Sequence, residues 1–375
     1  MTVFTERCAL GPEKGMRVAI KDSIDVAGMA TRMGSAAFAQ AAPATAHAEV
    51  VERLLAAGCR MVGKTVLHEF AFGVSGINPA CGTPRNHRYP DRIPGGSSSG
   101  SAVSVAAGEA DIALGTDTGG SVRMPATCCG VYGFKPTFGR VSRRGVWPAV
   151  TSLDCVGVFA PNLELLERAE AIIDPRYEPQ AFSGELHIGL VEVDADAAIA
   201  DAIGLYVRTS GCDVEAVELP LFEAAFEAGL TVINAETWSA FGAYLETGCV
   251  GKDVAERLER AADTGPQAVL GAERIRQAFS DQVDALLERY SVLALPTLPS
   301  FPLLLDEALA GKTDLRSTAL VRPFNLSGHP ALSIPLDIDG RPAGLQLVGR
   351  HGDDARLLSA ARELERLVAT TNKND

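Results

Sequence analysis

The segment "PGGSSSGSAVSVAAG" (residues 94–108) begins with glycines and three consecutive serines and continues into alanine and valine. Its first half has the composition of a flexible linker, but a linker is polar on both sides. This segment instead leads directly into a stretch that predicts a short helix over 101–108. Gly95, Gly96 and Gly100 allow a close backbone approach, and a serine-rich loop at a helix N-terminus can hold an anion or a catalytic hydroxyl. We therefore interpret the segment as a constrained functional loop.

Strands and helices are predicted to alternate around this loop, which is typical of an α/β protein. Short apolar runs predict strands, and segments of helical periodicity that end at glycine predict helices. In the N-terminal part, we expect strands at 16–20, 60–65 and 111–117, and helices at 47–58 and from about 121.

The rest of the chain divides into a middle and a C-terminal part. The middle, about 162–290, is mostly helical by its periodicity, with candidate strands at 185–193 and 212–220. The C-terminal part, about 291–370, predicts a strand at 291–297, a hairpin that turns at Asp339-Gly340 and a helix at 353–370. Because no repeat and no long linker separates these parts, we expect a single domain over residues 1–375.

The composition excludes several classes of protein. A net charge of -13 and the lack of a basic stripe argue against nucleic-acid binding, and no apolar run approaches the roughly eighteen residues of a membrane span. Glu6, Arg7 and Glu13 occupy the region where a signal peptide needs an apolar core, so we expect a cytoplasmic protein. The 8 cysteines form no C-x-x-C pair, which indicates reduced thiols.

Three short motifs match known sites but lie in the wrong context. "GCRMVGKT" (58–65) matches a phosphate-binding P-loop, yet a helix instead of a strand is expected before it, so nucleotide binding stays a remote alternative. "GSSSG" (96–100), with Ser98 as nucleophile, matches the hydrolase elbow but follows a polar segment. "HEFAF" (68–72) lacks the second histidine of a zinc protease, and no other spacing suits a metal. We therefore expect neither a metal nor a cofactor.

A larger constellation comes from three stretches taken together: "VAIKDSIDVAG" (18–28), "PGGSSSGSAVSVAAG" (94–108) and "LGTDTGGSVRMPATCCGVYGFKPTFGRVS" (114–142). In this combination the chain resembles the amidase signature family of serine hydrolases, which cleave carboxamides. Strong resemblance covers a signature core of about 16–160, and weaker resemblance covers 291–349. It implies one α/β domain with a large mixed β-sheet covered by α-helices on both faces.

The resemblance also implies a Ser–cis-Ser–Lys triad. Ser121 corresponds to the acylated nucleophile, Ser97 to the bridging serine after a cis Gly96-Ser97 bond, and Lys21 to the base. The chemistry is sound in itself, because a serine hydroxyl attacks only once a base removes its proton. Lysine acts as that base only as the neutral amine, and burial lowers its pKa from about 10.4.

The residues around Ser121 receive supporting roles. Thr118, Gly119 and Gly120, together with Ser121, offer consecutive N–H groups at an expected helix start, which suits an oxyanion hole and substrate binding. The resemblance implies that the supporting residues brace the site without reacting: Gly96, Ser99, Asp117 and Arg123. We also expect aromatic residues to line the acyl pocket: Phe70, Phe72 and Trp147.

The function expected from the resemblance is hydrolysis of a small-molecule amide to a carboxylate plus ammonia or an amine, through a Ser121 acyl-enzyme. The acyl group stays open between aliphatic, arylacetamide or indoleacetamide, malonamide and carbamoyl types. The alternative is an amidotransferase-type subunit that passes ammonia to a partner. The resemblance also leaves a homodimer open.

Overall fold

An 11-stranded mixed β-sheet runs through the protein, in the order β1-β3-β2-β4-β6-β5-β10-β11-β9-β7-β8. The computed structural model describes residues 2–314 and 316–371. The strands are β1 (Phe4–Leu10), β2 (Arg17–Lys21), β3 (Arg60–Thr65), β4 (Ile112–Asp117), β5 (Tyr132–Lys135), β6 (Cys155–Ala160), β7 (His187–Val191), β8 (Asp213–Val217), β9 (Val292–Pro296), β10 (Ala331–Ile338) and β11 (Arg341–Val348).

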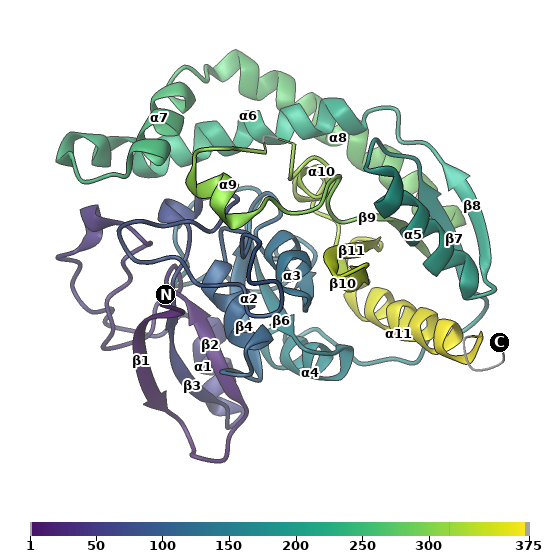
Figure 1. The fold of residues 1–375 in the computed structure, drawn as a ribbon, viewed down its shortest axis with the longest axis horizontal. Coiled ribbons are helices and arrows are strands. Elements are labelled where there is room, and N and C mark those ends of the chain that lie inside the picture. The colour runs from purple at the N-terminus through teal and green to yellow at the C-terminus, as the bar shows by residue number, and fades with distance from the viewer. Residues whose placement is uncertain (1, 315, 372–375) are drawn as a thin grey trace.

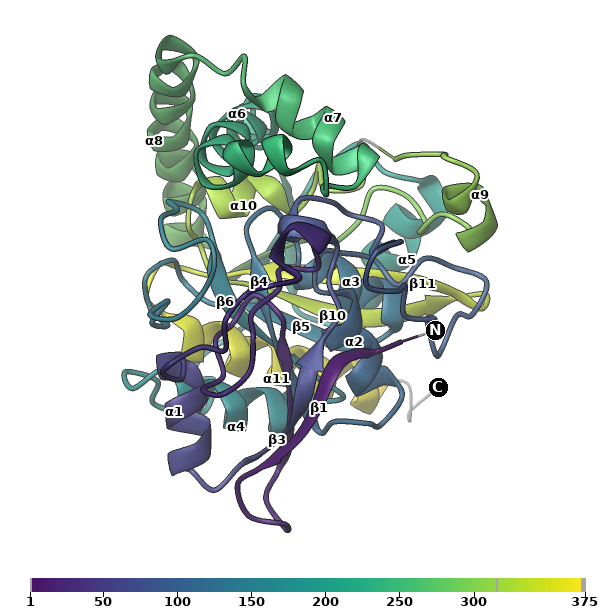
Figure 2. The same ribbon diagram turned by 90° about the vertical axis from the view of Figure 1, so that its left-hand side faces the viewer.

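Eleven α-helices are assigned among the described residues (Figures 1 and 2). They are α1 (Glu49–Ala56), α2 (Ser99–Ala106), α3 (Arg123–Cys129), α4 (Leu163–Ile173), α5 (Ala197–Thr209), α6 (Phe222–Phe241), α7 (Lys252–Ala261), α8 (Pro266–Arg289), α9 (Leu305–Leu309), α10 (Arg322–Leu326) and α11 (Asp354–Thr371). The expected strands and helices of the N-terminal, middle and C-terminal parts are confirmed, with ends that shift by a few residues.

Helices cover both faces of the sheet because side chains alternate along each strand. On β2, Val18 and Ile20 join the core that contains α1, α4, α5 and α11. Ala19, between them, points to the opposite face and joins the core under α2 and α3. The mixed sheet with helices on both faces, which the resemblance implies, is therefore confirmed.

The parallel strands β2, β3 and β4 place the functional segments at one edge of the sheet. β2 pairs in parallel with β3 on one side and with β4 on the other. The carboxyl ends of parallel strands lie at the same edge, so Lys21, which ends β2, and Asp117, which ends β4, come together there. The helices α6, α7 and α8 lie over this end of the molecule (Figures 1 and 2).

The hairpin β10–β11 lies between β5 and β9 in the sheet and so joins its two halves. Its strands pair in an unbroken antiparallel register from Ala331 opposite Val348 to Ile338 opposite Arg341. Asp339 and Gly340 both have positive φ angles, 52° and 74°, as a two-residue hairpin turn of this kind requires. The turn expected from Asp339-Gly340 is confirmed.

Several features of the N-terminal part were not foreseen, among them the strands β5 and β6. β1 is an edge strand that pairs with β3 and is half-exposed; its polar residues hide the apolar alternation that signals a strand. Helix α3 begins at Arg123, two residues later than expected, so residues 118–121 form a turn before the helix.

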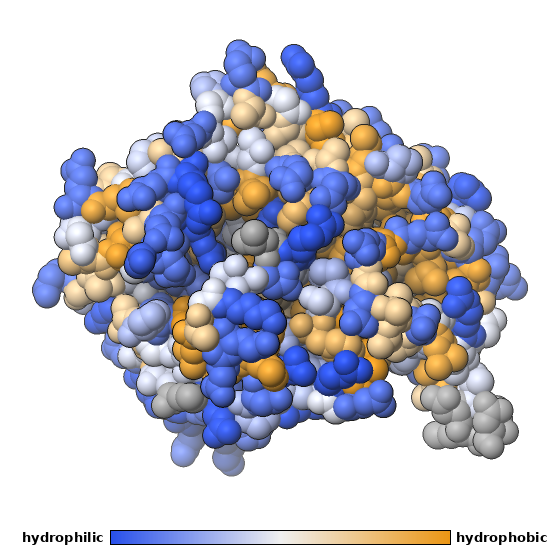
Figure 3. Space-filling view, turned by 45° about the horizontal axis from the view of Figure 1, so that its top comes forward, coloured by the Kyte–Doolittle hydropathy of each residue, from blue (hydrophilic) through white to orange (hydrophobic). Residues whose placement is uncertain are grey.

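The surface on the side of α6–α8 has hydrophilic side chains interspersed with smaller hydrophobic areas (Figure 3). Within residues 2–314 and 316–371, no helix combines the length and the apolar character that crossing a membrane would require.

A substitution at Gly100 tests how closely α2 packs against the backbone next to β3. A Cβ at this position would lie 2.7 Å from the Val66 carbonyl oxygen and 2.7 Å from that of Val3, both of which are backbone atoms. We expect Gly100→Ala to lower the free energy of unfolding by about 1–3 kcal/mol, measured by urea denaturation.

Gly271 in α8 provides the matched control, since a Cβ there meets nothing within 4 Å. Gly271→Ala should raise the stability by about 0.5–1 kcal/mol, because alanine is the better helix former. A Gly100→Ala protein as stable as the wild type would contradict the packing described here.

Candidate active site

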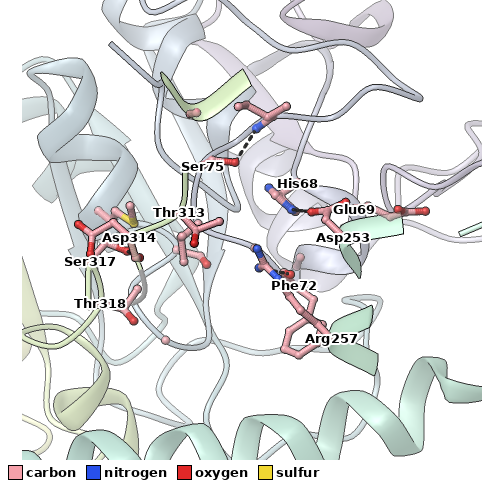
Figure 4. A pocket seen from close by; sticks show the side chains of 18 of the residues that line it. His68, Glu69, Phe72, Ser75, Asp253, Arg257, Thr313, Asp314, Ser317 and Thr318 are labelled. Atoms are coloured by element: carbon pink, nitrogen blue, oxygen red, sulfur yellow. Dashed lines mark hydrogen bonds and ion pairs between the residues drawn. The ribbon is translucent and has the colours of Figure 1, made fainter. Parts of the chain in front are cut away.

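A cavity of about 1360 Å³ lies between the edge of the sheet and the helices α6 and α7. Its wall includes Thr118, Gly119 and Ser121 from the turn after β4. Figure 4 shows Thr313, Asp314, Ser317 and Thr318 on one side of it and His68, Phe72, Asp253 and Arg257 on the other. Ser121 is 9% exposed and lines the cavity, while Thr118 and Gly119 of the same turn are half-buried.

Lys21 lies beneath this wall and is fully buried. Its Nζ is 2.8 Å from Ser97 Oγ, 2.8 Å from Thr116 Oγ1 and 3.5 Å from the Thr116 carbonyl oxygen. Burial lowers the pKa of Lys21 to about 7, although the carboxylates of Asp154 and Asp117 oppose this shift. Desolvation disfavours the ammonium form, so a large fraction of the side chain is the neutral amine near neutral pH.

The loop at 94–101 is held on several sides, which excludes the linker interpretation. The Gly96-Ser97 peptide bond is cis. The Ser97 carbonyl accepts a hydrogen bond of 3.0 Å from the His68 N–H, and the Gly100 N–H donates to the Val66 carbonyl at 3.0 Å. Every residue from Gly95 to Ser101 is buried.

Ser98 and Ser99, the other two of the three consecutive serines, form no hydrogen bond with Lys21. Ser98 Oγ donates to the Thr116 carbonyl at 3.2 Å and accepts from the Thr116 N–H at 3.4 Å, so it fixes the loop to β4. Ser99 Oγ is buried and has no hydrogen-bond partner among the described residues. The elbow arrangement with Ser98 as nucleophile is therefore absent.

Asp117 shapes the turn that carries Ser121. Its carboxylate accepts hydrogen bonds from the N–H groups of Gly120 at 2.7 Å, Val122 at 3.2 Å and Arg123 at 3.3 Å. The Gly120 N–H therefore already donates to Asp117 and is not free to donate to an oxyanion, as we had expected. Gly120 instead lets the chain pass closely, with φ at 113° and a Cβ position 2.3 Å from Val321 Cγ2. Among the described residues, the N–H groups of Thr118, Gly119 and Ser121 have no partner.

Arg123 completes a buried network around Asp117. Both side chains are fully buried, with 2.9 Å between Arg123 Nη2 and Asp117 Oδ1. The Arg123 guanidinium also donates to Asn325 Oδ1, Gln346 Oε1 and the Val321 carbonyl. The Arg123 charge and the hydrogen bonds that Arg123 and Asn325 donate to the Asp117 carboxylate hold the pKa of Asp117 well below its usual range despite burial.

Ser121 is not hydrogen-bonded to Ser97 or to Lys21 in the described part of the chain. The structure therefore joins Lys21 and Ser97 by a hydrogen bond and places Ser121 in the wall of the cavity. Hydrogen bonds to a nucleophile are often long in a protein without substrate and shorten when substrate binds.

Lys64, the other buried lysine of this region, has a different partner. Its Nζ lies 2.7 Å from Asp22 Oδ1 and donates to Thr31 Oγ1 and the Ala30 carbonyl. It lies within strand β3, and α1 precedes Gly58, so the strand–loop–helix order of a P-loop is missing. The structure thus argues against the nucleotide-binding alternative.

The aromatic residues expected in the acyl pocket are only partly there. Phe72 lines the cavity. Phe70 is buried and stacks on Phe241, with ring centroids 4.6 Å apart, because φ at 54° turns it into the core. Trp147 lines a separate cavity of about 680 Å³. The expectation was wrong for Phe70 and Trp147.

One group outside the cavity brings metal-binding residue types together: Asp284, His329 and His351. The two imidazole rings overlap with centroids 3.7 Å apart and planes inclined by 34°. The atoms that could bind a metal lie within 4.8 Å of one another, but several of them already have hydrogen-bond partners within the protein. His329 Nε2 also lies 3.1 Å from Asp284 Oδ1, which is an ordinary hydrogen-bond distance.

Comparisons with known proteins match nearly the whole chain. The sequence pattern of the family called Amidase matches residues 5–178 and 207–358. The chain belongs to the amidase signature family. Amidase 1 of Arabidopsis thaliana is 31% identical, over 95% of this chain and 93% of that protein. A glutamyl-tRNA(Gln) amidotransferase subunit of Methanococcoides burtonii is 34% identical, over 95% and 85%.

A crystal structure of an amidase has the same fold as this member of the family. It superposes with a TM-score of 0.87 and 31% identity, covering 95% of this chain and 85% of that one. As a family member, the protein is a hydrolase that acts on C–N bonds.

Sequence reasoning missed several residues of the site: Thr116, Asp154, Asn325 and Gln346. Asn325 lies in "PFNLSGHPALSIP", which carries part of the resemblance, so a signal existed but gave no role. Thr116 lies in the quoted stretch 114–142, but its contact with Lys21 forms only when β4 pairs with β2. The charge effect of Asp154 on Lys21 arises only when β6 pairs with β4.

Asp117→Ala tests the bracing network. It would leave the fully buried Arg123 guanidinium without its carboxylate and free the N–H groups that Asp117 holds. We expect the free energy of unfolding to fall by about 3–5 kcal/mol, measured by urea denaturation.

The matched control is Glu363→Ala, which removes an acidic partner from an exposed arginine, Arg366. This change should shift the denaturation midpoint far less, because solvent screens exposed pairs. Equal effects of the two substitutions would contradict the structural role given to Asp117.

Proposed function

We propose that the protein is a serine amidase that hydrolyses a small-molecule carboxamide to a carboxylate and ammonia or an amine. One observation carries the proposal: a fully buried lysine, Lys21, with its pKa lowered to about 7, lies 2.8 Å from Ser97 under the turn that presents Ser121. A neutral amine in this place is a base held ready for a serine hydroxyl.

The proposed reaction moves one proton along the three side chains. Ser121 Oγ attacks the amide carbonyl and gives its proton to Ser97, which passes its own to Lys21 Nζ. The N–H groups without a partner at Thr118, Gly119 and Ser121 stabilise the oxyanion. Lys21 then returns the proton through Ser97 to the leaving nitrogen, and water hydrolyses the acyl-enzyme by the same route. The scheme needs no cofactor.

A second candidate function is that of an amidotransferase-type subunit. It is favoured by the relatives named as subunits of glutamyl-tRNA(Gln) amidotransferase, which are as similar to this chain as the relatives named amidase. Such a subunit would release ammonia efficiently only with its partner. Ammonia release by the purified chain alone separates the two functions.

The remaining expectations stay predictions. They are that the chain forms a single domain, that it is located in the cytoplasm, that its substrate is a small molecule and that a homodimer is open. The cavity of about 1360 Å³ is compatible with such a substrate.

Ser121→Ala tests the nucleophile. We expect the rate of ammonia release to fall by at least about a thousandfold and the covalent acyl adduct to disappear, because the substitution removes the hydroxyl that attacks the substrate. Coupled ammonia detection and intact-protein mass spectrometry measure the two effects.

Ser98→Ala is the matched control, because Ser98 belongs to the elbow-like motif and contacts only Thr116 by its hydroxyl. It should retain acylation. Acylation lost in Ser98→Ala but kept in Ser121→Ala would refute the assignment.

The pH profile tests the base. Below the pKa of Lys21, about 7, the amine is protonated and cannot accept a proton. kcat/KM should therefore rise with pH and level off above this pKa, falling roughly tenfold per pH unit on the acid side. Lys21→Arg, which stays protonated, should be inactive at every pH. A profile that is flat from pH 5 to pH 9 would contradict Lys21 as the base.

A further inference from the structure

Arg322 is a buried cation in the wall of the cavity. It is 8% exposed and begins the short helix α10. Its Nη2 donates to Thr318 Oγ1 at 2.6 Å. Its Nε and Nη1 are buried and have no hydrogen-bond partner among the described residues. Buried polar groups without partners are costly, so this side chain requires an explanation.

Arg123 shows how this protein satisfies a buried arginine. That guanidinium binds a carboxylate, two side-chain carbonyls and a backbone carbonyl. Arg322, by contrast, has no ion pair with any carboxylate in residues 2–314 and 316–371. The acidic residue that acts on it most, Glu227, is exposed on α6. The buried Arg123 is therefore paired with a carboxylate, whereas the buried Arg322 at the cavity has no such partner among the described residues.

Arg322 lies next to the turn that carries Ser121. The Cβ position of Gly119 is 3.7 Å from Arg322 Nε. Gly229 of α6 makes room for the stem of the side chain, since a Cβ there would lie 2.9 Å from Arg322 Cγ. The guanidinium carbon is 4.3 Å from the centre of the Phe226 ring, which fixes its plane. A substrate that reaches Ser121 thus passes within reach of Arg322.

Three other charged groups of the cavity wall have partners of their own. Glu69 accepts hydrogen bonds from Ser35 and from the Gly251 N–H. Asp253 pairs with His68. Arg316 pairs with Glu223 at 2.8 Å. An anion supplied from outside the chain would give Arg322 Nε and Nη1 the partner that they lack among the described residues.

We propose that Arg322 binds a carboxylate of the substrate, so that the enzyme prefers amides in which a carboxylate lies a short chain away from the cleaved bond. The inference rests on the proposed function and specifies its substrate class. A carboxylate would accept the hydrogen bonds that Nε and Nη1 offer, and charge-assisted bonds of this type are strong in a desolvated site. Burial also lowers the pKa of Arg322 to about 10, a shift that a bound carboxylate would oppose.

Matched substrate pairs test the proposal. Succinamate carries the carboxylate on the acyl side, and 4-methylpentanamide replaces it with an isopropyl group of similar shape. N-butyrylglycine and N-isobutylbutyramide form the same pair on the leaving side. We expect the wild type to prefer the carboxylate in at least one pair by roughly 10–100-fold in kcat/KM, as suits hydrogen bonds to charged groups.

Arg322→Gln should remove this preference, lowering the ratio of the two kcat/KM values by roughly 10–100-fold. Arg316→Gln is the matched control: it removes an arginine from the same cavity wall, but one that is exposed and paired with Glu223. Its ratio should stay within about twofold of the wild type. Thermal unfolding verifies that each variant is folded.

The outcomes separate the two claims. Equal kcat/KM values within both pairs for the wild type would overturn the inference while leaving the amidase function intact, and this result needs no variant. A ratio unchanged by Arg322→Gln would also overturn it. Calorimetry on Ser121→Ala reads binding without turnover. Succinamate or N-butyrylglycine that binds this variant, but not Ser121→Ala/Arg322→Gln, supports the carboxylate site even if no amide is cleaved.

Discussion

The desolvation of one amine is the constraint on which the site depends. Lys21 ends a central strand, is fully buried and has hydroxyl and carbonyl oxygens as its hydrogen-bond partners. Lys64, on the adjacent strand, is equally buried but touches a carboxylate. Direct contact with a carboxylate favours the charged form, whereas hydroxyl neighbours leave burial as the main effect. Burial lowers the pKa of both lysines, but the Asp22 carboxylate in contact with Lys64 opposes this shift, whereas Lys21, the proposed base, has no carboxylate in direct contact.

The loops that carry Ser97 and Ser121 depend in turn on the residues that hold them by hydrogen bonds around that amine. The cis loop at Ser97 is fixed through Val66 and His68, and the turn at Ser121 is fixed by Asp117. Arg123 extends these contacts to Asn325 of α10 and Gln346 of β11, which belong to the C-terminal part of the chain. The site therefore needs both halves of the chain, although the residues proposed to react all come from the first.

Much of the fold and of the core of the site could be predicted from the sequence. The glycine–serine loop, the hairpin at Asp339-Gly340 and the buried strand that ends at Lys21 have local signals. The edge strand β1 escaped because its alternation is masked by polar residues. The engaged N–H of Gly120 and the unpaired guanidinium of Arg322 depend on which groups the tertiary structure brings near, and no spacing in the sequence encodes that. Phe70 was misplaced for the same reason.

The central claim concerns the charge of Lys21, and NMR observes it directly. The titration of the lysine side-chain ¹³Cε resonances, with the Lys21 signal assigned by its absence in Lys21→Met, gives the pKa of this amine in the folded protein. The account predicts a midpoint at about 7. A midpoint near the reference value of about 10.4 would show that Lys21 stays an ammonium ion at neutral pH, and it would contradict the account.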